Sequence, residues 1–357
     1  MTRSQDLARR ATVVLCVTAA LMGPGNLAGA SVGTTAVGLS PRPGALVYIA
    51  NLHSDTVSVV DTGTGTGTGT VVDSVPVGDG PDSVAVSPDG SRVYVTNSAS
   101  DTVSVIDART RTVIATVAVG DEPSRVTVSP DNRNVYVANV GSDNVSVIST
   151  RTRAVTETIA VGDAPLGVAV APDGCTLYVA NAASGTVSVV RTATGTVTDT
   201  IPVGSGPTAL VLTPDGRRMY VSNLTSDDVS VVDVHDGTET DRIPVGDQPA
   251  GIGVLPDGRQ VYVANIGSDN VSVISTRGRA VTETVAVGDG PNGLAVSPDG
   301  SLVYVSNFDS DTLSVIDTST ARVANTVTVG DGPTGVAAVQ GKAGTARGPN
   351  TARVQLA

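Results

Sequence analysis

The chain lacks the side chains on which many cofactor sites depend. Its 357 residues include no tryptophan, one phenylalanine, two cysteines and two histidines. Enzymes that stack a quinone cofactor on broad aromatic surfaces are therefore disfavoured. The sequence also contains no phosphate-binding glycine loop, no haem attachment motif and no zinc-ligand spacing. These absences exclude the best-marked classes of cofactor site.

Positive charge is scarce as well. The chain carries 22 lysine and arginine residues against 34 aspartates and glutamates, for a formal net charge of −12. Proteins bind nucleic-acid backbones by replacing counterions with lysine and arginine side chains. The composition therefore predicts that the protein has no nucleic-acid partner.

The first thirty residues are typical of an export signal. Arg3, Arg9 and Arg10 precede an apolar run over residues 11–22, and Ala28-Gly29-Ala30 is a small-residue cleavage site. The run is too short to cross a bilayer comfortably, and no later stretch is apolar enough for an integral membrane segment. Residues 1–30 are predicted to be a signal peptide, either of the general type or, on the Arg9-Arg10 pair, of the twin-arginine type. The protein is expected to be secreted and extracellular, with cell-envelope association left open.

Neither cysteine is expected to form an internal disulfide. Cys16 lies within the signal peptide, so Cys175 would stand alone in the mature chain. An exported protein with one cysteine must be stabilised by packing instead. Residues 341–357 are polar, and this tail is predicted to be disordered.

The most prominent feature that the chain does have is a short string that returns seven times. Each copy has tyrosine in second place and asparagine in last place, and the spacing is 42 residues except for a first interval of 46. The copies are VYIAN at 47–51, VYVTN at 93–97, VYVAN at 135–139, LYVAN at 177–181, MYVSN at 219–223, VYVAN at 261–265 and VYVSN at 303–307. A fixed period in this range indicates a repeat architecture.

Within one repeat, apolar residues alternate with a period of two, and four segments lie between turn signals. In the repeat after Gly80 the segments are 83–86, 93–95, 103–106 and 113–119, and a Ser-Pro-Asp-Gly turn separates the first two. Four short antiparallel strands cannot bury both faces alone, so they are expected to stack on copies of themselves. The fold class predicted for residues 31–340 is an all-β, seven-bladed β-propeller of four-stranded antiparallel blades.

Two segments compete to complete the first blade. Residues 36–41 near the N-terminus and residues 335–338 near the C-terminus both fit the pattern of the first strand. Pairing of the C-terminal segment with residues 45–77 would tie the two ends of the ring together, and this arrangement is favoured. The extra residues of the first interval fall in 62–70, a Gly-Thr run expected to form a longer surface loop.

The linked motifs resemble those of a known family. VYVAN and VYVTN are followed by SDTVSVID, and VGDGP and SPDG recur in the same order through residues 33–340. This combination is similar to the YVTN family of β-propeller repeat proteins. The resemblance implies a propeller of the surface-layer, periplasmic or secreted type, with relatives among lactonase-type enzymes. It implies no particular site residue.

Strand order predicts which loops share a face. If the strand before SPDG is innermost, the VGDGP crossings and the loops after each asparagine lie together, on the usual binding face of propellers. Sixteen acids and one base, Arg125, fall in these loops. The acids would suit a Ca²⁺ ion, yet aspartates in such loops commonly cap turn amides, and no D-x-D-x-D-G loop supplies calcium ligands. No cofactor is therefore expected, with Ca²⁺ as the single candidate.

Residues that differ between repeats are better functional candidates than invariant ones. Each invariant asparagine is expected to bridge a strand-to-loop turn. On the acidic face two groups of positions vary, namely His53, Ser98, Val140, Ala182, Leu224, Ile266 and Phe308, and then Asp82, Arg125, Leu166, Thr208 and Asn292. The candidate ligand-binding residues at the mouth of the channel are His53, Asp82, Arg125, Asn292, Phe308 and Asp309.

Structural interpretations of these candidates stay open. His53 suits a solvated loop, Arg125 suits pairing with neighbouring aspartates, and Phe308 suits a cover over the channel. No catalytic residue and no metal ligand is assigned, because no partner for His53 can be identified and His235 falls on the opposite face.

Two of the repeats are nearly interchangeable. Residues 137–165 and 263–291 differ at four of 29 positions, so both cannot carry unique catalytic groups. The sequence therefore favours a monomeric binding or scaffold module without catalysis, which presents its acidic face to an unknown protein or a small cationic ligand. The alternative is a lactonase-like, metal-dependent hydrolase with its site at the mouth of the channel.

Overall fold

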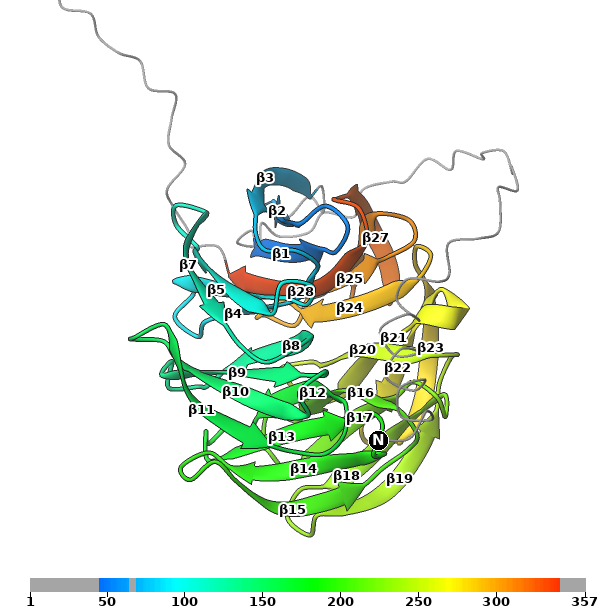
Figure 1. Cartoon of the computed structure of the whole chain (residues 1–357). Coiled ribbons are helices and arrows are strands. Elements are labelled where there is room, and N and C mark those ends of the chain that lie inside the picture. Colours follow the sequence, from blue (N-terminus) through cyan, green and yellow to red (C-terminus); the bar gives the residue numbers. More distant parts are fainter. Residues whose placement is uncertain (1–44, 64–68, 341–357) are drawn as a thin grey trace, which may run out of the picture.

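Seven four-stranded sheets form a closed ring. A computed structural model describes residues 45–63 and 69–340, and these residues contain 28 strands and one short 3-10 helix. The inner strands surround the centre in Figure 1, and the fourth strand of each sheet lies at the rim. The predicted seven-bladed propeller of four-stranded antiparallel blades is confirmed.

The blades are numbered from the N-terminus, and their strands are given from the centre outward. Blade 1 has β28 (Pro333–Gln340), β1 (Ala45–Asn51), β2 (Thr56–Asp61) and β3 (Thr70–Pro76). Blade 2 has β4 (Pro81–Val86), β5 (Arg92–Asn97), β6 (Thr102–Asp107) and β7 (Thr112–Ala118). Blade 3 has β8 (Pro123–Val128), β9 (Asn134–Asn139), β10 (Asn144–Ser149) and β11 (Ala154–Ala160). Blade 4 has β12 (Pro165–Val170), β13 (Thr176–Asn181), β14 (Thr186–Arg191) and β15 (Thr196–Pro202).

The remaining blades repeat this order. Blade 5 has β16 (Pro207–Leu212), β17 (Arg218–Asn223), β18 (Asp228–Asp233) and β19 (Thr238–Pro244). Blade 6 has β20 (Pro249–Val254), β21 (Gln260–Asn265), β22 (Asn270–Ser275) and β23 (Ala280–Ala286), with the 3-10 helix η1 (Ile266–Ser268) between β21 and β22. Blade 7 has β24 (Pro291–Val296), β25 (Leu302–Asn307), β26 (Thr312–Asp317) and β27 (Arg322–Thr328).

The Ser-Pro-Asp-Gly turn fixes the register of the inner hairpin. In blade 2 the Ser87 hydroxyl donates to Asp89 over 2.6 Å, Asp89 also accepts the backbone N–H of Ser91 over 3.0 Å, and Gly90 has a φ of 67°. Glycine adopts this positive φ without the steric cost that other residues meet. The Ser87 hydroxyl and the Ser91 amide stabilise the ionised carboxyl and lower the pKa of Asp89 to about 2.

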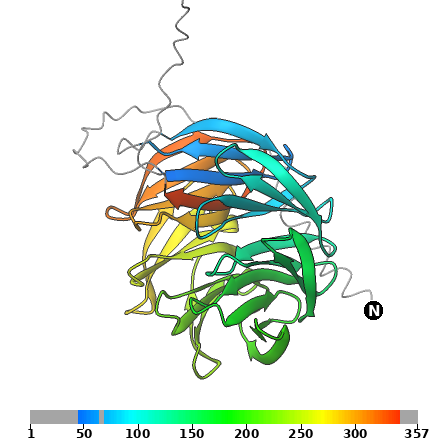
Figure 2. The same ribbon diagram turned by 90° about the vertical axis from the view of Figure 1, so that its left-hand side faces the viewer.

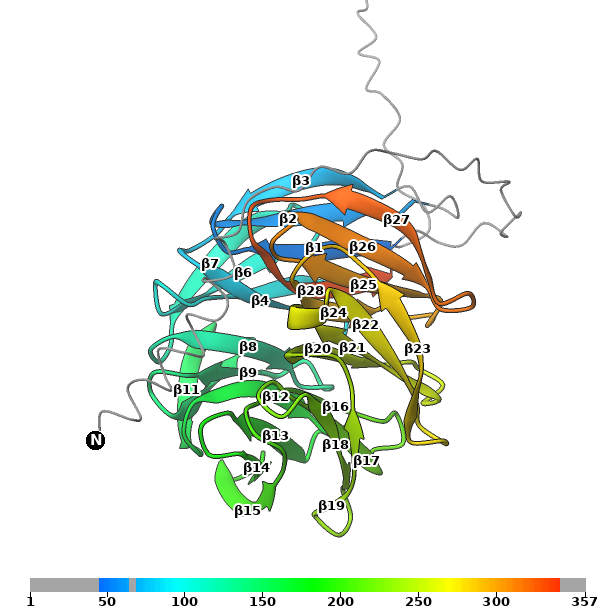
Figure 3. The same cartoon turned by 90° about the vertical axis from the view of Figure 1, so that its right-hand side faces the viewer.

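The ring is closed by a strand from the far end of the chain. β28 pairs antiparallel with β1, with Tyr48 opposite Ala337 and Val47 opposite Ala338. Figure 2 shows the red C-terminal strand beside the blue N-terminal strands, and Figure 3 shows β27 of blade 7 next to β3 of blade 1 at the rim. The favoured C-terminal closure is therefore confirmed. The competing segment 36–41 lies outside the described residues, as does the middle of the expected 62–70 loop.

The core consists of contacts between neighbouring blades, because each sheet is apolar on both faces. Tyr48 in blade 1, for example, packs with Val84, Val93 and Val95 of blade 2 and is fully buried. The serine in the middle of each third strand is also buried. The seven tyrosines are thus the large side chains that pack between blades, as the presence of one tyrosine in each repeat predicted.

The seven repeat-invariant asparagines are buried structural residues. Each is 0% exposed and donates its side-chain amide to the serine of the third strand over 2.8–3.0 Å. Each also donates to the side chain five residues further on, as Asn181 does to Thr186 over 3.2 Å. The predicted structural role of the asparagine is therefore confirmed, and its side chain ties the second strand to the third strand in addition to bridging the turn.

The glycine that begins each VGDGP-type crossing makes room for this asparagine. A Cβ atom on Gly162 would lie 2.7 Å from Cγ and Nδ2 of Asn181. We expect Gly162→Ala to lower the free energy of unfolding by about 1–3 kcal/mol, since the buried amide cannot move away without losing its hydrogen bonds. Urea denaturation followed by circular dichroism measures the change. The matched control is Gly278→Ala, where the nearest atom would be 3.4 Å away, and equal stability of both variants would contradict the prediction.

The terminal predictions fall on parts of the chain that the structure leaves undescribed. The signal peptide over 1–30 and the polar tail over 341–357 both lie outside residues 45–63 and 69–340. Within the described residues, no helix is long and apolar enough to cross a membrane.

Candidate functional site

Two kinds of loop meet on one face of the ring, as predicted. They are the crossings between blades and the loops between the second and third strands. The backbone N–H of Phe308, in a loop between second and third strands, donates to the backbone carbonyl of Gly290 in a crossing. The backbone N–H of Leu52 donates in the same way to the carbonyl of Gly332, and both distances are 2.9 Å. These two kinds of loop are called the loop face from here on. They meet at the ends of the inner strands and surround the mouth of the channel.

Six aspartates of the loop face hold the crossings in place. Each has a positive φ and accepts a backbone N–H from the next crossing over 2.8–2.9 Å. They are Asp55, Asp101, Asp143, Asp227, Asp269 and Asp311. The turn-capping interpretation of these acids is therefore confirmed.

A second set of aspartates lies exposed in the crossings. Its members are Asp79, Asp121, Asp163, Asp247, Asp289 and Asp331, and Ser205 replaces the aspartate in the crossing from blade 4 to blade 5. Asp331 differs from the others in that its carboxylate contacts an imidazole.

Ring closure brings His53, Phe308 and Asp331 together. His53 lies in the β1–β2 loop of blade 1, and its Nδ1 is 3.2 Å from Oδ1 of Asp331 in the crossing from blade 7. Phe308, in the β25–β26 loop of blade 7, meets the imidazole edge to face with ring centroids 5.4 Å apart. His53, Phe308 and Asp331 are called the closure cluster from here on.

Gly332 allows this close approach. It has a φ of 62°, and a Cβ atom there would lie 2.8 Å from Nδ1 of His53 and 3.2 Å from Cε2 of Phe308. An ionised carboxylate only accepts hydrogen bonds, so Nδ1 of His53 carries the proton in the contact with Asp331. In this tautomer Nε2 carries the lone pair and faces a substrate or a water molecule.

Asp309 follows Phe308 in the β25–β26 loop of blade 7. Partial burial, followed by the negative charges of Asp269, Asp289 and Asp311, raises the pKa of Asp309 above its ordinary value of 3.8. Its carboxylate lies over Gly290, where a Cβ atom would be 2.6 Å from Oδ2. Asp309 therefore lies over the crossing from blade 6 to blade 7, among the carboxylates that raise its pKa.

Removal of the Asp309 charge should stabilise the protein at neutral pH. A raised pKa in the folded state means that Asp309 favours folding below its unfolded pKa and that this contribution is lost as the pH rises through the folded pKa. We expect Asp309→Asn to gain less than about 1 kcal/mol at pH 7, because solvent screens exposed charges. Thermal unfolding from pH 3 to pH 8 measures the gain, which should vanish toward pH 3. A variant less stable than wild type at pH 7 would contradict this sign.

The structure corrects the register assumed for His53. The backbone N–H of His53 donates to the backbone carbonyl of Asp331, and that of Asp309 donates to the backbone carbonyl of Asp289. The residue before each, Leu52 or Phe308, donates its backbone N–H to the backbone carbonyl of the following glycine, Gly332 or Gly290. His53 is thus the equivalent of Asp309, and Leu52 is the equivalent of Phe308. Comparison of the repeats by sequence instead groups His53 with Phe308.

Arg125 lies in the central channel, apart from the closure cluster. It lines a cavity of about 140 Å³ to which all seven inner strands contribute. The apolar members of this lining are Val84, Val126, Val168, Ala209, Leu210, Ile252, Leu294 and Val336. Arg125 is the one charged residue among those that line the cavity.

The other two candidates serve contacts between blades. Asp82 accepts a hydrogen bond from the hydroxyl of Ser124 in the next blade over 2.8 Å. Each of the two residues follows the proline that begins its inner strand, so Ser124, and not Arg125, is the equivalent of Asp82. Asn292 is buried on β24, and its backbone carbonyl oxygen lies 2.4 Å from where a Cβ atom on Gly251 of the neighbouring blade would be. Neither residue belongs to the closure cluster.

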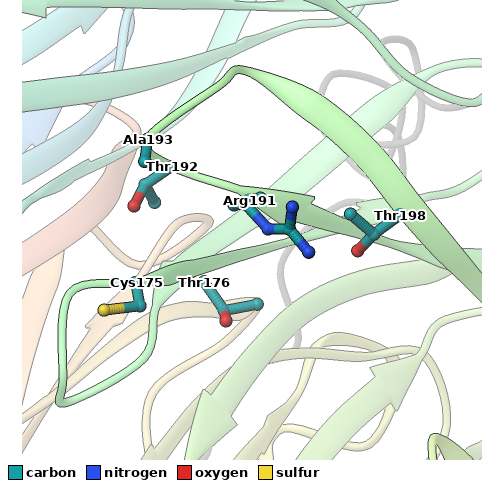
Figure 4. Close-up of a pocket in the computed structure, with 6 residues that line it drawn as sticks. All are labelled: Cys175, Thr176, Arg191, Thr192, Ala193 and Thr198. Carbon is teal, nitrogen blue, oxygen red and sulfur yellow. The ribbon is translucent and has the colours of Figure 1, made fainter.

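A second cavity lies on blade 4, at the opposite ends of the strands. It measures about 340 Å³ and is lined by Cys175, Thr176, Arg191, Thr192, Ala193 and Thr198. In Figure 4 the thiol of Cys175 points away from Arg191. This lining holds no carboxylate or histidine, so the cavity offers no acid–base pair.

The described residues do not fit a metal centre. No group of three or more histidine, cysteine, aspartate or glutamate side chains converges within residues 45–63 and 69–340. The six turn-capping aspartates are engaged with backbone amides, and the exposed aspartates belong to separate crossings. No chemical step is therefore assigned to a metal ion.

The fold and the closure cluster together define a seven-bladed propeller with a histidine–aspartate contact on its loop face. The chain belongs to the family described as "Lactonase, 7-bladed beta-propeller", which matches residues 44–202 and 200–339. No curated protein sequence matches the chain.

Solved structures share the fold at low identity. Hydrazine synthase of Kuenenia stuttgartiensis is 23% identical, with a TM-score of 0.67 over 73% of this chain and 96% of that one. A Bacteroides uniformis protein provisionally assigned as a 6-phosphogluconolactonase is 18% identical, with a TM-score of 0.72 over 83% and 99%. A Lactobacillus plantarum protein is 19% identical, with a TM-score of 0.74 over 84% and 100%. At these identities the likeness concerns the fold alone.

Family membership contradicts the expectation of a non-catalytic binding or scaffold module. The lactonase family favours the hydrolase that stood as the alternative. The argument from interchangeable repeats holds for blades 3 and 6 only, whereas the closure cluster lies in blades 7 and 1. Sequence analysis also missed Asp331, because its GDGP motif recurs in other crossings and only ring closure sets it beside His53.

Proposed function

We propose that the protein is a lactonase-like hydrolase that opens a lactone at the closure cluster. The observation that carries this proposal is the contact between His53 and Asp331, 3.2 Å apart, with Phe308 against the imidazole. Membership of the lactonase propeller family supports a hydrolytic role.

The residues of the closure cluster divide the reaction between them. Asp331 holds the proton of His53 on Nδ1, so that Nε2 can take a proton from water as the water oxygen attacks the lactone carbonyl. The tetrahedral oxyanion then collapses, and the ring C–O bond breaks. The imidazolium of His53 then returns the proton from Nε2 to the departing alkoxide. The product is a hydroxy acid, and the imidazole is neutral again for the next turnover.

Phe308 gives this site its apolar wall. Its ring packs edge to face against His53 and limits rotation of the imidazole. Because the closure cluster lies on the surface, a substrate can reach Nε2 from solvent. The side chain of His53 is 43% exposed, which is consistent with such access.

The remaining expectations complete the proposal. The mature enzyme acts outside the cytoplasm after removal of residues 1–30, as a monomer, and belongs to the YVTN-type subdivision of these propellers. The signal-like pattern of residues 1–30 supports the first of these points, and the VYVxN strings support the last.

A titration assay tests the proposed activity. Opening of a lactone releases one proton at neutral pH, so base uptake in a pH-stat reports turnover directly. Five- and six-membered lactones should both be supplied to the mature protein, with spontaneous hydrolysis subtracted. Proton release that scales with enzyme concentration is expected, and its absence for every lactone offered would contradict the proposal.

A further inference from the structure

Arg125 occupies a position where the other blades have small residues. The 42-residue repeat places Ser83, Gly167, Ala209, Gly251, Gly293 and Gly335 at the equivalent point of the other inner strands. Arg125 is the third residue of β8, near the end of that strand at the loop face. The channel at this level therefore holds one guanidinium among glycine, alanine and serine.

This guanidinium has no counter-charge among the described residues. Among the ion pairs of residues 45–63 and 69–340 none involves Arg125, although aspartates are abundant on the loop face. The nearest candidate from the sequence, Asp82, accepts the hydroxyl of Ser124 instead. Enclosure of a charge in a channel costs free energy unless an opposite charge or hydrogen-bond acceptors accompany it.

The channel wall adds further hydrogen-bond donors. In each sheet the inner strand pairs with one neighbour only, so its other edge faces the channel. A strand edge presents unpaired backbone N–H groups. Further from the loop face than Arg125 the channel wall is apolar, and Val126 is the next residue of the same strand. The polar part of the channel is thus its loop-face end.

We infer that this end of the channel is a binding site for a small carboxylate. The two oxygens of a carboxylate match two parallel N–H donors of a guanidinium. The cavity of about 140 Å³ is close to the ~150 Å³ cavity that holds benzene, so the ligand has roughly six to eight non-hydrogen atoms. The acids around the mouth repel a dianion more than a monoanion, which favours carboxylate over phosphate.

The carboxylate site is independent of the proposed hydrolysis. It uses no residue of the closure cluster, and a ligand binds there whether or not the protein opens lactones. A binding measurement therefore separates a failure of this inference from a failure of the proposed function.

Isothermal titration of the mature protein with acetate and benzoate, and separately with inorganic phosphate, tests the site. Wild type should bind at least one of the two carboxylates and bind phosphate more weakly. Arg125→Gly, which installs the residue found in four other blades, should weaken carboxylate binding by about tenfold or more. Arg125→Lys, which keeps the charge without the guanidinium fork, should give an intermediate affinity.

The matched control is Arg217→Ser, which removes an exposed arginine in the β16–β17 turn. Serine stands at the equivalent place in blades 2 and 7. This variant should bind carboxylates as wild type does. Absence of carboxylate binding by wild type, or equal affinity of wild type and Arg125→Gly, would overturn the inference. Circular dichroism of Arg125→Gly establishes that the fold is retained.

Discussion

Replacement of His53 by alanine is expected to lower kcat/KM for lactone opening by about 10²–10⁴-fold, the usual contribution of a positioned general base. The expectation rests on the contact of Nδ1 with Asp331 over 3.2 Å, which leaves Nε2 to activate water. Removal of the imidazole eliminates that base while the loop backbone keeps its hydrogen bond to the crossing. Initial rates in a pH-stat give the ratio.

The chain offers a matched control for this variant. His235 lies in the β18–β19 turn on the opposite face, and its side chain is 95% exposed. His235→Ala removes the second of the two histidines without touching the closure cluster, so its rate should equal that of wild type. Equal rates for His53→Ala and His235→Ala would show that His53 has no part in the chemistry.

Truncation of Tyr48 to alanine is expected to lower the free energy of unfolding by about 3–5 kcal/mol, as for other aromatic residues in cores. Tyr48 is 0% exposed, lies opposite Val59 and Ala337 in its own sheet, and packs against blade 2. The variant therefore leaves a cavity at the seam that joins the two ends of the chain. Urea denaturation monitored by circular dichroism measures the loss.

Tyr48→Phe separates packing from hydrogen bonding at the same place. The buried hydroxyl of Tyr48 has no hydrogen-bond partner among the described residues, and burial raises its pKa above 10.0. Removal of a hydroxyl that makes no bond should be neutral or slightly stabilising. A loss for Tyr48→Phe as large as that for Tyr48→Ala would show that the hydroxyl, and not the ring, stabilises the seam.

The fold could be predicted from the sequence because the same local pattern occurs seven times. Each VYVxN string places a tyrosine between blades and an asparagine at the end of the second strand, and each SPDG motif forms the turn that precedes it. One repeat is weak evidence for a strand pattern, but seven in register determine the architecture. The turn-capping role of aspartates such as Asp55 follows from the same repetition.

The closure cluster could not be predicted in the same way. His53 and Asp331 are 278 residues apart, and they meet because β28 completes blade 1. The sequence favoured this closure, but the partner of His53 depends on side-chain directions in two loops. Asp331 resembles the other crossing aspartates in sequence, and its position opposite an imidazole distinguishes it only in three dimensions.

The position of Arg125 shows a second limit of repeat analysis. The sequence placed Arg125 in one row with Asp82 and Asn292, and both of these residues instead serve contacts between blades. Arg125 is one residue further along its inner strand than Asp82 and Asn292 are along theirs, and it lines the cavity that all seven inner strands share. In blade 2 the register of the inner strand shifts between Pro81 and Ser83, so simple alternation does not determine where a side chain points there.

A double-mutant cycle on lactone opening tests the central claim most directly. Wild type, His53→Ala, Asp331→Asn and the double variant are compared by kcat/KM in one pH-stat assay. Since Asp331 acts by orienting His53, the account predicts that the double variant is no slower than His53→Ala alone, although Asp331→Asn by itself is slow. Two reductions that multiply, or rates unchanged by either substitution, would contradict it.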